Sequence, residues 1–87
     1  MAEVTMYSTA YCGYCRAAKQ FLKSRKGVDV KEIDVSADPE RRRWLVKTTG
    51  QQTVPQIWVG ETHVGGYDDL RALDAAGGLD PLLNAGI

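Results

Sequence analysis

The sequence predicts one α/β domain over residues 1–87, a four-stranded mixed sheet flanked by helices on both faces. The length suits one small domain with one modest core, and no repeat, low-complexity tract or linker divides the chain. Apolar residues recur with a period of two in some segments and at helical spacing in others, in the order strand, helix, strand, helix, strand, strand, helix. The first strand–helix–strand unit implies two parallel strands with a right-handed crossover, and a tight hairpin adds two antiparallel strands.

The first half of the chain supplies the parallel pair. Glu3–Tyr7 alternates apolar and polar residues as a short strand does, and residues 8–11 form a loop. Apolar residues then recur at helical spacing from Gly13 to about Lys26, where Gly27 ends the helix. Residues 28–34 alternate again, so we expect a strand with one buried face. The apolar face of the helix consists of Ala17, Ala18, Phe21 and Leu22.

A second helix is predicted to start at Asp38, an acidic cap followed by proline and a further acid. We expect it to run to about Thr48, to bury Trp44 and Leu45, and to end at Gly50. The elements expected after it are strand Gln56–Val59, turn Gly60–Glu61, strand Thr62–Val64, a helix opened by Asp68 and Asp69 and closed by Gly77 and Gly78, and one further turn at Leu79–Leu83. This order of elements is that of the thioredoxin fold.

Composition and charge exclude several classes of protein. Eleven Lys and Arg residues balance eleven Asp and Glu residues, which argues against a nucleic-acid binder. The one basic cluster, Arg41–Arg43, is interpreted as a solvated helix face. The N-terminus has no signal-peptide pattern, and no segment approaches the length of a membrane span. We therefore expect a cytoplasmic protein with no membrane partner.

The two cysteines, Cys12 and Cys15, carry the chemistry. A bridge between residues this close constrains little of the unfolded chain, so the pair indicates reactivity or metal binding. At a helix N-terminus, Cys12 meets unpaired backbone N–H groups, which lower the pKa of a thiol and favour a nucleophilic thiolate. Cys15, one turn inside the helix, is suited to resolve a mixed disulfide formed by Cys12. A zinc site needs four ligands, and His63 on the hairpin is the one good candidate beyond the cysteines, so no metal is expected.

Two further segments are candidates for substrate binding. A cis bond between Val54 and Pro55 would turn the Val54 backbone groups towards the sulfurs, where they could pair with an extended peptide; alone, a proline at a strand start indicates a turn. The Gly65–Asp69 segment offers backbone N–H donors for a carboxylate and an Asp68 or Asp69 side chain for an ammonium group. That combination fits an α-amino acid head group, although for this segment taken alone an ordinary Asp-capped helix after a glycine turn is the favoured interpretation.

Together these motifs resemble the glutaredoxin family, in particular its small bacterial dithiol members. The resemblance covers nearly the whole chain. Its blocks are Cys12-x-Tyr14-Cys15, Thr53-Val54-Pro55-Gln56, Gly65-Gly66-x-Asp68-Asp69-Leu70 and Ala72-Leu73-Asp74-x-x-Gly77-Gly78-Leu79-Asp80. It implies an enzyme that uses glutathione to reduce protein disulfides and protein–glutathione mixed disulfides, acting as a monomer. Ribonucleotide reductase is a protein substrate by family resemblance alone.

The resemblance also assigns roles to residues. It implies that Cys12 attacks the sulfur and Cys15 resolves the mixed disulfide. The residues implied to bind glutathione are Tyr14 in the groove, Val54 and Pro55 at the cysteinyl part, Gly66, Tyr67 and Asp68 with Thr53 nearby at the γ-glutamyl end, and Lys47 at the glycine carboxylate. Asp69 is a weaker candidate at the γ-glutamyl end.

This chain departs from the family pattern at two positions. Gly13 stands where proline is common, and Thr9 where many members carry lysine. Without that cation, the pKa of Cys12 is expected to be less depressed than in a lysine-bearing relative, with Arg16 compensating in part. Glycine after the first cysteine also occurs in relatives that hold a [2Fe–2S] cluster in a dimer. One alternative is therefore a cluster carrier or redox sensor with Cys12 and glutathione as ligands; another is a thioredoxin-like reductant served by a flavoenzyme.

Overall fold

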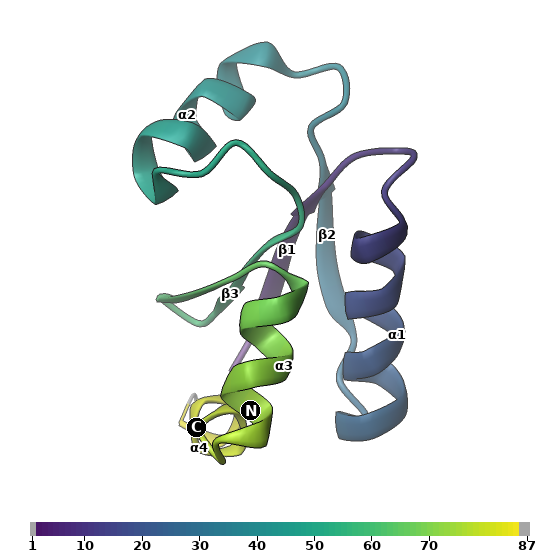
Figure 1. Cartoon of the computed structure of the whole chain (residues 1–87), viewed down its shortest axis with the longest axis vertical. Coiled ribbons are helices and arrows are strands. Elements are labelled where there is room, and N and C mark those ends of the chain that lie inside the picture. Colours follow the sequence, from purple (N-terminus) through teal and green to yellow (C-terminus); the bar gives the residue numbers. More distant parts are fainter. Residues whose placement is uncertain (1, 86–87) are drawn as a thin grey trace.

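The computed structural model describes residues 2–85, which form a four-stranded sheet with helices on both faces (Figure 1). The elements in chain order are β1 (Val4–Ser8), α1 (Gly13–Lys26), β2 (Val30–Asp34), α2 (Pro39–Thr49), β3 (Gln56–Val59), β4 (Thr62–Gly65), α3 (Tyr67–Ala75) and α4 (Leu79–Asn84). The strand order is β2-β1-β3-β4, with β1 and β2 parallel and the other pairs antiparallel. The predicted mixed sheet and its hairpin are confirmed.

The main core lies between one face of the sheet and helices α1, α3 and α4. In β1, Val4 and Met6 are buried while Thr5 and Tyr7 are half-buried, which is the period-two pattern of a strand with one core face. Leu22 of α1 and Leu70 of α3 are fully buried against this face. The rest of this core includes Cys15, Ala18, Phe21, Val28, Ile57, Val59, Leu79 and Leu83.

Strand β2 is shorter than predicted because the preceding residues finish α1. Gly27 takes the left-handed conformation at φ 64°, and the Val28 amide then donates to the Leu22 carbonyl over 3.1 Å. Val28 is buried by this helix cap and does not belong to the strand. Two charged residues, Lys31 and Glu32, are adjacent in β2, so the alternation of apolar and charged residues is interrupted there. No side chain of this edge strand is completely buried.

Helix α2 begins and ends where the sequence predicts, but it does not bury Trp44. Asp38 caps the helix by accepting from the Arg41 amide over 3.0 Å, and Leu45 is buried. Trp44 is 45% exposed, so the prediction for that side chain was wrong. Its ring packs at the sheet face opposite α1 and α3, with its centroid 5.5 Å from that of Tyr7. This contact with Tyr7 covers the Trp44 ring only in part.

The C-terminal helices close the core. Helix α3 starts at Tyr67, one residue earlier than predicted, and the further turn is the short helix α4. Lys26, at the end of α1, pairs with Asp74 at 2.7 Å and with Asp80 at 2.9 Å, which ties three helices together. These two carboxylates raise the pKa of Lys26. No helix within residues 2–85 is long and apolar enough to cross a membrane.

Candidate active site

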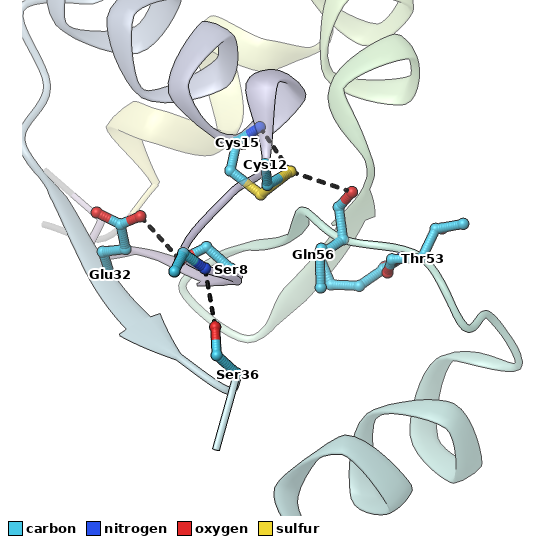
Figure 2. The surroundings of a disulfide bond; sticks show 9 residues. Ser8, Cys12, Cys15, Glu32, Ser36, Thr53 and Gln56 are labelled. Atoms are coloured by element: carbon cyan, nitrogen blue, oxygen red, sulfur yellow. Dashed lines mark hydrogen bonds between the residues drawn. A yellow bond between two sulfur atoms is a disulfide. The ribbon is translucent and has the colours of Figure 1, made fainter. Parts of the chain in front are cut away.

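The two cysteines lie at the N-terminus of α1 and are joined as a disulfide (Figure 2). Cys12 is the N-cap residue with extended backbone and is half-buried, whereas Cys15 is 2% exposed. The Cys15 amide donates to the Cys12 sulfur over 3.1 Å. The first turn of α1 carries no acidic residue. Negative charge on the Cys12 sulfur is therefore favoured by a hydrogen-bond donor and by the helix dipole, with no adjacent carboxylate in that turn to oppose it.

The loop before β3 approaches the same sulfur. The Val54–Pro55 peptide bond is cis, and the Cys12 sulfur lies 3.7 Å from the Val54 carbonyl oxygen. Pro55 is buried and Val54 is half-buried. Backbone groups of Val54 are thus available beside the sulfur instead of being paired within the sheet, as the sequence predicted.

A groove of about 280 Å³ runs from this loop to the start of α3. The rings of Tyr14 and Tyr67, both in its lining, have centroids 6.1 Å apart. Seven residues predicted to bind substrate line it together: Tyr14, Thr53, Val54, Pro55, Gly66, Tyr67 and Asp68. Gln51 and Asp69 complete the lining.

At the α3 end of the groove, the two aspartates differ. The Asp69 carboxylate accepts from the Gly66 amide over 3.1 Å and so caps the helix start. Asp68 is exposed at the groove. Gly65 has φ 113°, and a Cβ there would meet the Asp69 carboxylate, so this turn requires glycine. The Asp69 carboxylate is thus engaged in the helix cap, whereas Asp68 is exposed in the groove lining.

Of the two α2 side chains Arg42 and Lys47, Arg42 bonds to the loop that carries Gln51. Lys47 is exposed on α2 and does not line the groove, so the structure does not bring it to the other predicted residues. Arg42 is half-buried and donates to the Gln52 carbonyl over 3.3 Å, next to Gln51 in the groove. Arg41 and Arg43 of the arginine cluster are exposed, as expected for a solvated face, and Arg42 between them is half-buried and bonded to this loop.

Sequence reasoning also missed Gln51 and the residue that holds it. Gln56 is completely buried, and its amide nitrogen donates to the Gln51 side-chain oxygen over 2.8 Å. His63 is exposed on the hairpin as predicted, but its Nε2 lies 2.7 Å from the Gln56 side-chain oxygen. The available signal was a lone polar residue in the otherwise apolar run of β3.

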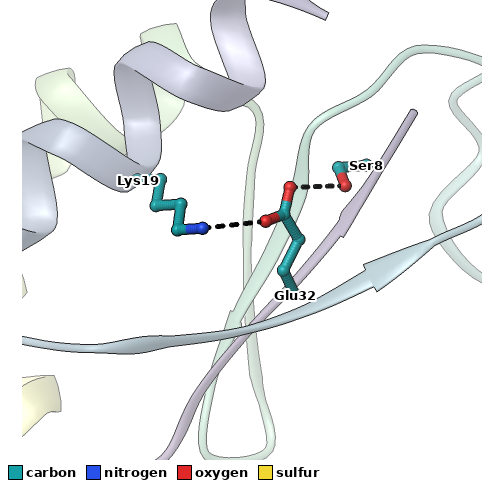
Figure 3. A network of polar contacts seen from close by, with 3 residues as sticks. All are labelled: Ser8, Lys19 and Glu32. Atoms are coloured by element: carbon teal, nitrogen blue, oxygen red, sulfur yellow. Dashed lines mark hydrogen bonds and ion pairs between the residues drawn. The ribbon is translucent and has the colours of Figure 1, made fainter. Parts of the chain in front are cut away.

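A second recess, of about 260 Å³, lies on the β2 side of the disulfide. Its lining includes Cys15, Thr9, Arg16 and Glu32. Glu32 accepts from the Ser8 hydroxyl over 2.8 Å and pairs with Lys19 at 3.2 Å (Figure 3). The Ser8 hydrogen bond is the main cause that lowers the pKa of Glu32, against a smaller opposing effect of burial. Thr9, which stands where lysine was expected from the resemblance, lines this recess together with Cys12.

In the part of the chain that the structure describes, His63 does not join the two cysteines as a third ligand. His63 contacts Gln56 and Trp58. Within residues 2–85, no three His, Cys, Asp or Glu side chains are grouped as a metal site.

Comparisons with known proteins agree on one family. The family model described as Glutaredoxin matches residues 4–64. A glutaredoxin of Pseudomonas aeruginosa is 58% identical over 98% of this chain and 100% of its own length. The solution structure of glutaredoxin from Brucella melitensis has a TM-score of 0.85 at 47% identity and covers 100% of this chain and 94% of that one. A buckwheat glutaredoxin–glutathione complex has a TM-score of 0.87 at 30% identity and covers 97% and 78%.

Proposed function

This chain belongs to the glutaredoxin family, and we propose that it is a glutathione-dependent thiol–disulfide oxidoreductase. Its substrates are protein disulfides and protein–glutathione mixed disulfides. The observation that carries the proposal is the approach of the Cys12 sulfur to the Val54 carbonyl, at 3.7 Å, beside a groove that ends at an exposed aspartate. A peptide thiol lying in that groove pairs with the Val54 backbone as an added strand does, which brings its sulfur to Cys12.

The α3 end of the groove supports glutathione as the peptide thiol. The amides at the helix start donate to the α-carboxylate of a γ-glutamyl group, and Asp68 accepts from its ammonium group. The aromatic rings of Tyr14 and Tyr67 flank the peptide. The buckwheat glutaredoxin in the glutathione complex shares this fold over nearly the whole chain.

The reaction proceeds by two thiol–disulfide exchanges. The Cys12 thiolate attacks one sulfur of the substrate disulfide, forms a mixed disulfide and releases the other sulfur as a thiolate that takes up a proton. The Cys15 thiol then loses its proton and attacks the Cys12 sulfur, which releases the second substrate thiol and leaves the Cys12–Cys15 disulfide. The low exposure of Cys15 keeps it from outside disulfides, so Cys12 acts first.

Two glutathione molecules complete the cycle. The thiolate of the first attacks the Cys12 sulfur and frees Cys15 as a thiol. The thiolate of the second attacks the glutathione sulfur of this mixed disulfide, which releases glutathione disulfide and restores the Cys12 thiolate. A protein–glutathione mixed disulfide enters the cycle at the second half, because Cys12 takes over its glutathionyl group directly.

The test is a glutathione-coupled reduction assay on the wild type and two variants. Cys12→Ser should lose activity towards every substrate. Cys15→Ser should keep deglutathionylation and lose reduction of protein disulfides. Full activity of Cys12→Ser would overturn the mechanism. A wild-type protein that a flavoenzyme reduces, but glutathione does not, would favour the thioredoxin-like alternative.

A cluster-bridged dimer is the second candidate function. Gly13, next to Cys12, carries no side chain, and a Cβ there would meet nothing within 4 Å, so this chain leaves room for a second copy beside Cys12. Cys12 would be this chain's ligand, with glutathione thiolates completing the set. A brown dimer after anaerobic purification with glutathione would support this function, and a colourless monomer would exclude it. The cytoplasmic location and ribonucleotide reductase as a substrate stay predictions.

A further inference from the structure

The carbonyl of Thr53 fixes the direction of a chain of side-chain hydrogen bonds. Gln56 is completely buried, and its Nε2 lies 3.0 Å from that carbonyl. A carbonyl oxygen can only accept, so the NH₂ group of Gln56 must face Thr53. The second proton of the same group then points to the Gln51 side chain, 2.8 Å away.

Gln51 must therefore present its oxygen to Gln56. The NH₂ group of Gln51 is on the other branch of its amide and is left for another partner. The backbone of Gln51 is also held, because its amide donates to the Thr49 hydroxyl over 3.1 Å. An exposed glutamine that is fixed in both backbone and side chain has little conformational entropy left to lose when it binds a ligand.

His63 lies at the other end of this series of hydrogen bonds. The oxygen of Gln56 faces the His63 Nε2 at 2.7 Å, so Nε2 must carry a proton and donate. The ring of His63 lies against Trp58, with centroids 4.6 Å apart, which restricts its orientation. Both polar atoms of the buried Gln56 side-chain amide thus have hydrogen-bond partners. The donor-to-acceptor direction of each hydrogen bond from His63 to Gln51 is therefore fixed.

We propose that Gln51 is a substrate-contacting residue that donates its amide N–H to the glycine carboxylate of glutathione, and that Gln56 and His63 are positioning residues for it. The inference rests on the proposed function. Gln51 lines the groove on the α2 side of Val54, whereas Asp68 lies on the α3 side. If the γ-glutamyl end of glutathione lies at α3, its glycine end extends towards Gln51. The fixed amide N–H of Gln51 can then donate to the glycine carboxylate.

The first experiment compares Gln51→Glu with Gln52→Glu. The Gln51→Glu variant keeps an oxygen for Gln56 and replaces the NH₂ donor with a negatively charged oxygen. Gln52 is an exposed neighbour outside the groove lining, so its variant adds the same charge without removing the donor. We expect the KM for glutathione to rise about tenfold in Gln51→Glu with kcat unchanged, and to stay within about twofold in Gln52→Glu.

A second thiol locates the contact on the ligand. γ-Glutamylcysteine lacks the glycine residue, so the difference in KM between wild type and Gln51→Glu should disappear with it. Equal effects of the two charge variants, or an undiminished effect with γ-glutamylcysteine, would overturn the assignment of Gln51. A wild type that glutathione does not reduce would instead defeat the proposed function, and this inference with it.

The positioning role is tested by His63→Phe, alone and combined with Gln51→Ala. Phenylalanine keeps a ring against Trp58 but cannot donate to Gln56. We expect the KM for glutathione to rise about threefold in His63→Phe, with kcat unchanged and no further rise when Gln51→Ala is already present. Independent effects in the double variant would show that His63 does not act through Gln51.

Discussion

The amide of Cys15 donates to the sulfur of Cys12 over 3.1 Å, so one cysteine supplies a donor that favours the anionic form of the other. This contact and the helix N-terminus predict that the pKa of Cys12 lies below the ordinary value of a thiol, because both favour the thiolate. The rate of alkylation by iodoacetamide, followed against pH in the reduced Cys15→Ser variant, measures it. The midpoint should move up to that of a free thiol when the protein is unfolded in guanidinium chloride. Identical midpoints in the two conditions would contradict the prediction.

A lysine in place of Thr9 should lower the pKa of Cys12 further. Thr9 and Cys12 line the same recess, so the introduced ammonium group lies near the sulfur and favours its anion. The same alkylation profile should shift to lower pH at low ionic strength, and less in 1 M salt. The control is Lys47→Gln on α2, which should leave the profile unchanged because Lys47 is exposed outside both the groove and this recess.

Proline in place of Gly13 should stabilise the protein by about 0.5–1 kcal/mol. Gly13 is the first residue of α1, where the amide has no partner within the helix, and nothing lies within 4 Å of a Cβ there. Cys12 before it already has the extended backbone that a following proline requires, with φ −109° and ψ 107°. Urea unfolding of the reduced protein measures the change. Gly27→Ala, at an equally open site with φ 64°, should destabilise the protein, and the same sign for both would be inconsistent with this reasoning.

The two aspartates of α3 should separate stability from binding. Asp69→Ala removes the acceptor of the Gly66 amide and should lower the free energy of unfolding by about 1 kcal/mol. Asp68→Ala removes an exposed side chain of the groove, so it should raise the KM for glutathione and leave the unfolding midpoint nearly unchanged. Denaturation and steady-state kinetics on both variants check this, and a reversed pattern would exchange the two roles.

Local sequence rules were sufficient for the elements that carry the sulfurs. A capping position, an uninterrupted apolar face and a terminal glycine define α1, which begins at Gly13 and ends at Lys26 as predicted. These signals come from residues close in the chain, so no knowledge of packing was needed for α1. The approach of Val54 to Cys12, 42 positions away, was inferred only from the proline and the cysteine pair taken together.

Features that depend on packing were not predictable in this way. Trp44 and Leu45 are neighbours on α2, and which of them is buried depends on how the helix lies on the sheet. Arg42 and Lys47 point about 140° apart on the helix, so only the docked orientation decides which cation meets the loop. The meeting of Gln56 with His63 depends on the pairing of β3 with β4, which is irregular between Ile57 and Trp58.

Removal of the Glu32 charge should make the protein less stable at neutral pH but not in acid. The Ser8 hydroxyl, and secondarily Lys19, bind the carboxylate and lower the pKa of Glu32. A pKa below the unfolded value means that the stabilisation is present above about pH 4.3 and is lost as pH falls through the folded pKa. Since the side chain is 35% exposed, Glu32→Gln should cost less than about 1 kcal/mol at pH 7. Urea unfolding at pH 7 and pH 3 measures the difference, which should shrink at pH 3.

The control is Asp29→Asn, which removes the ion pair between Asp29 and Lys23. The Asp29 side chain is 86% exposed, so solvent screens this pair, and the loss of stability in the variant should depend less on pH. A Glu32→Gln deficit that persists undiminished at pH 3 would show that packing, not charge, accounts for it.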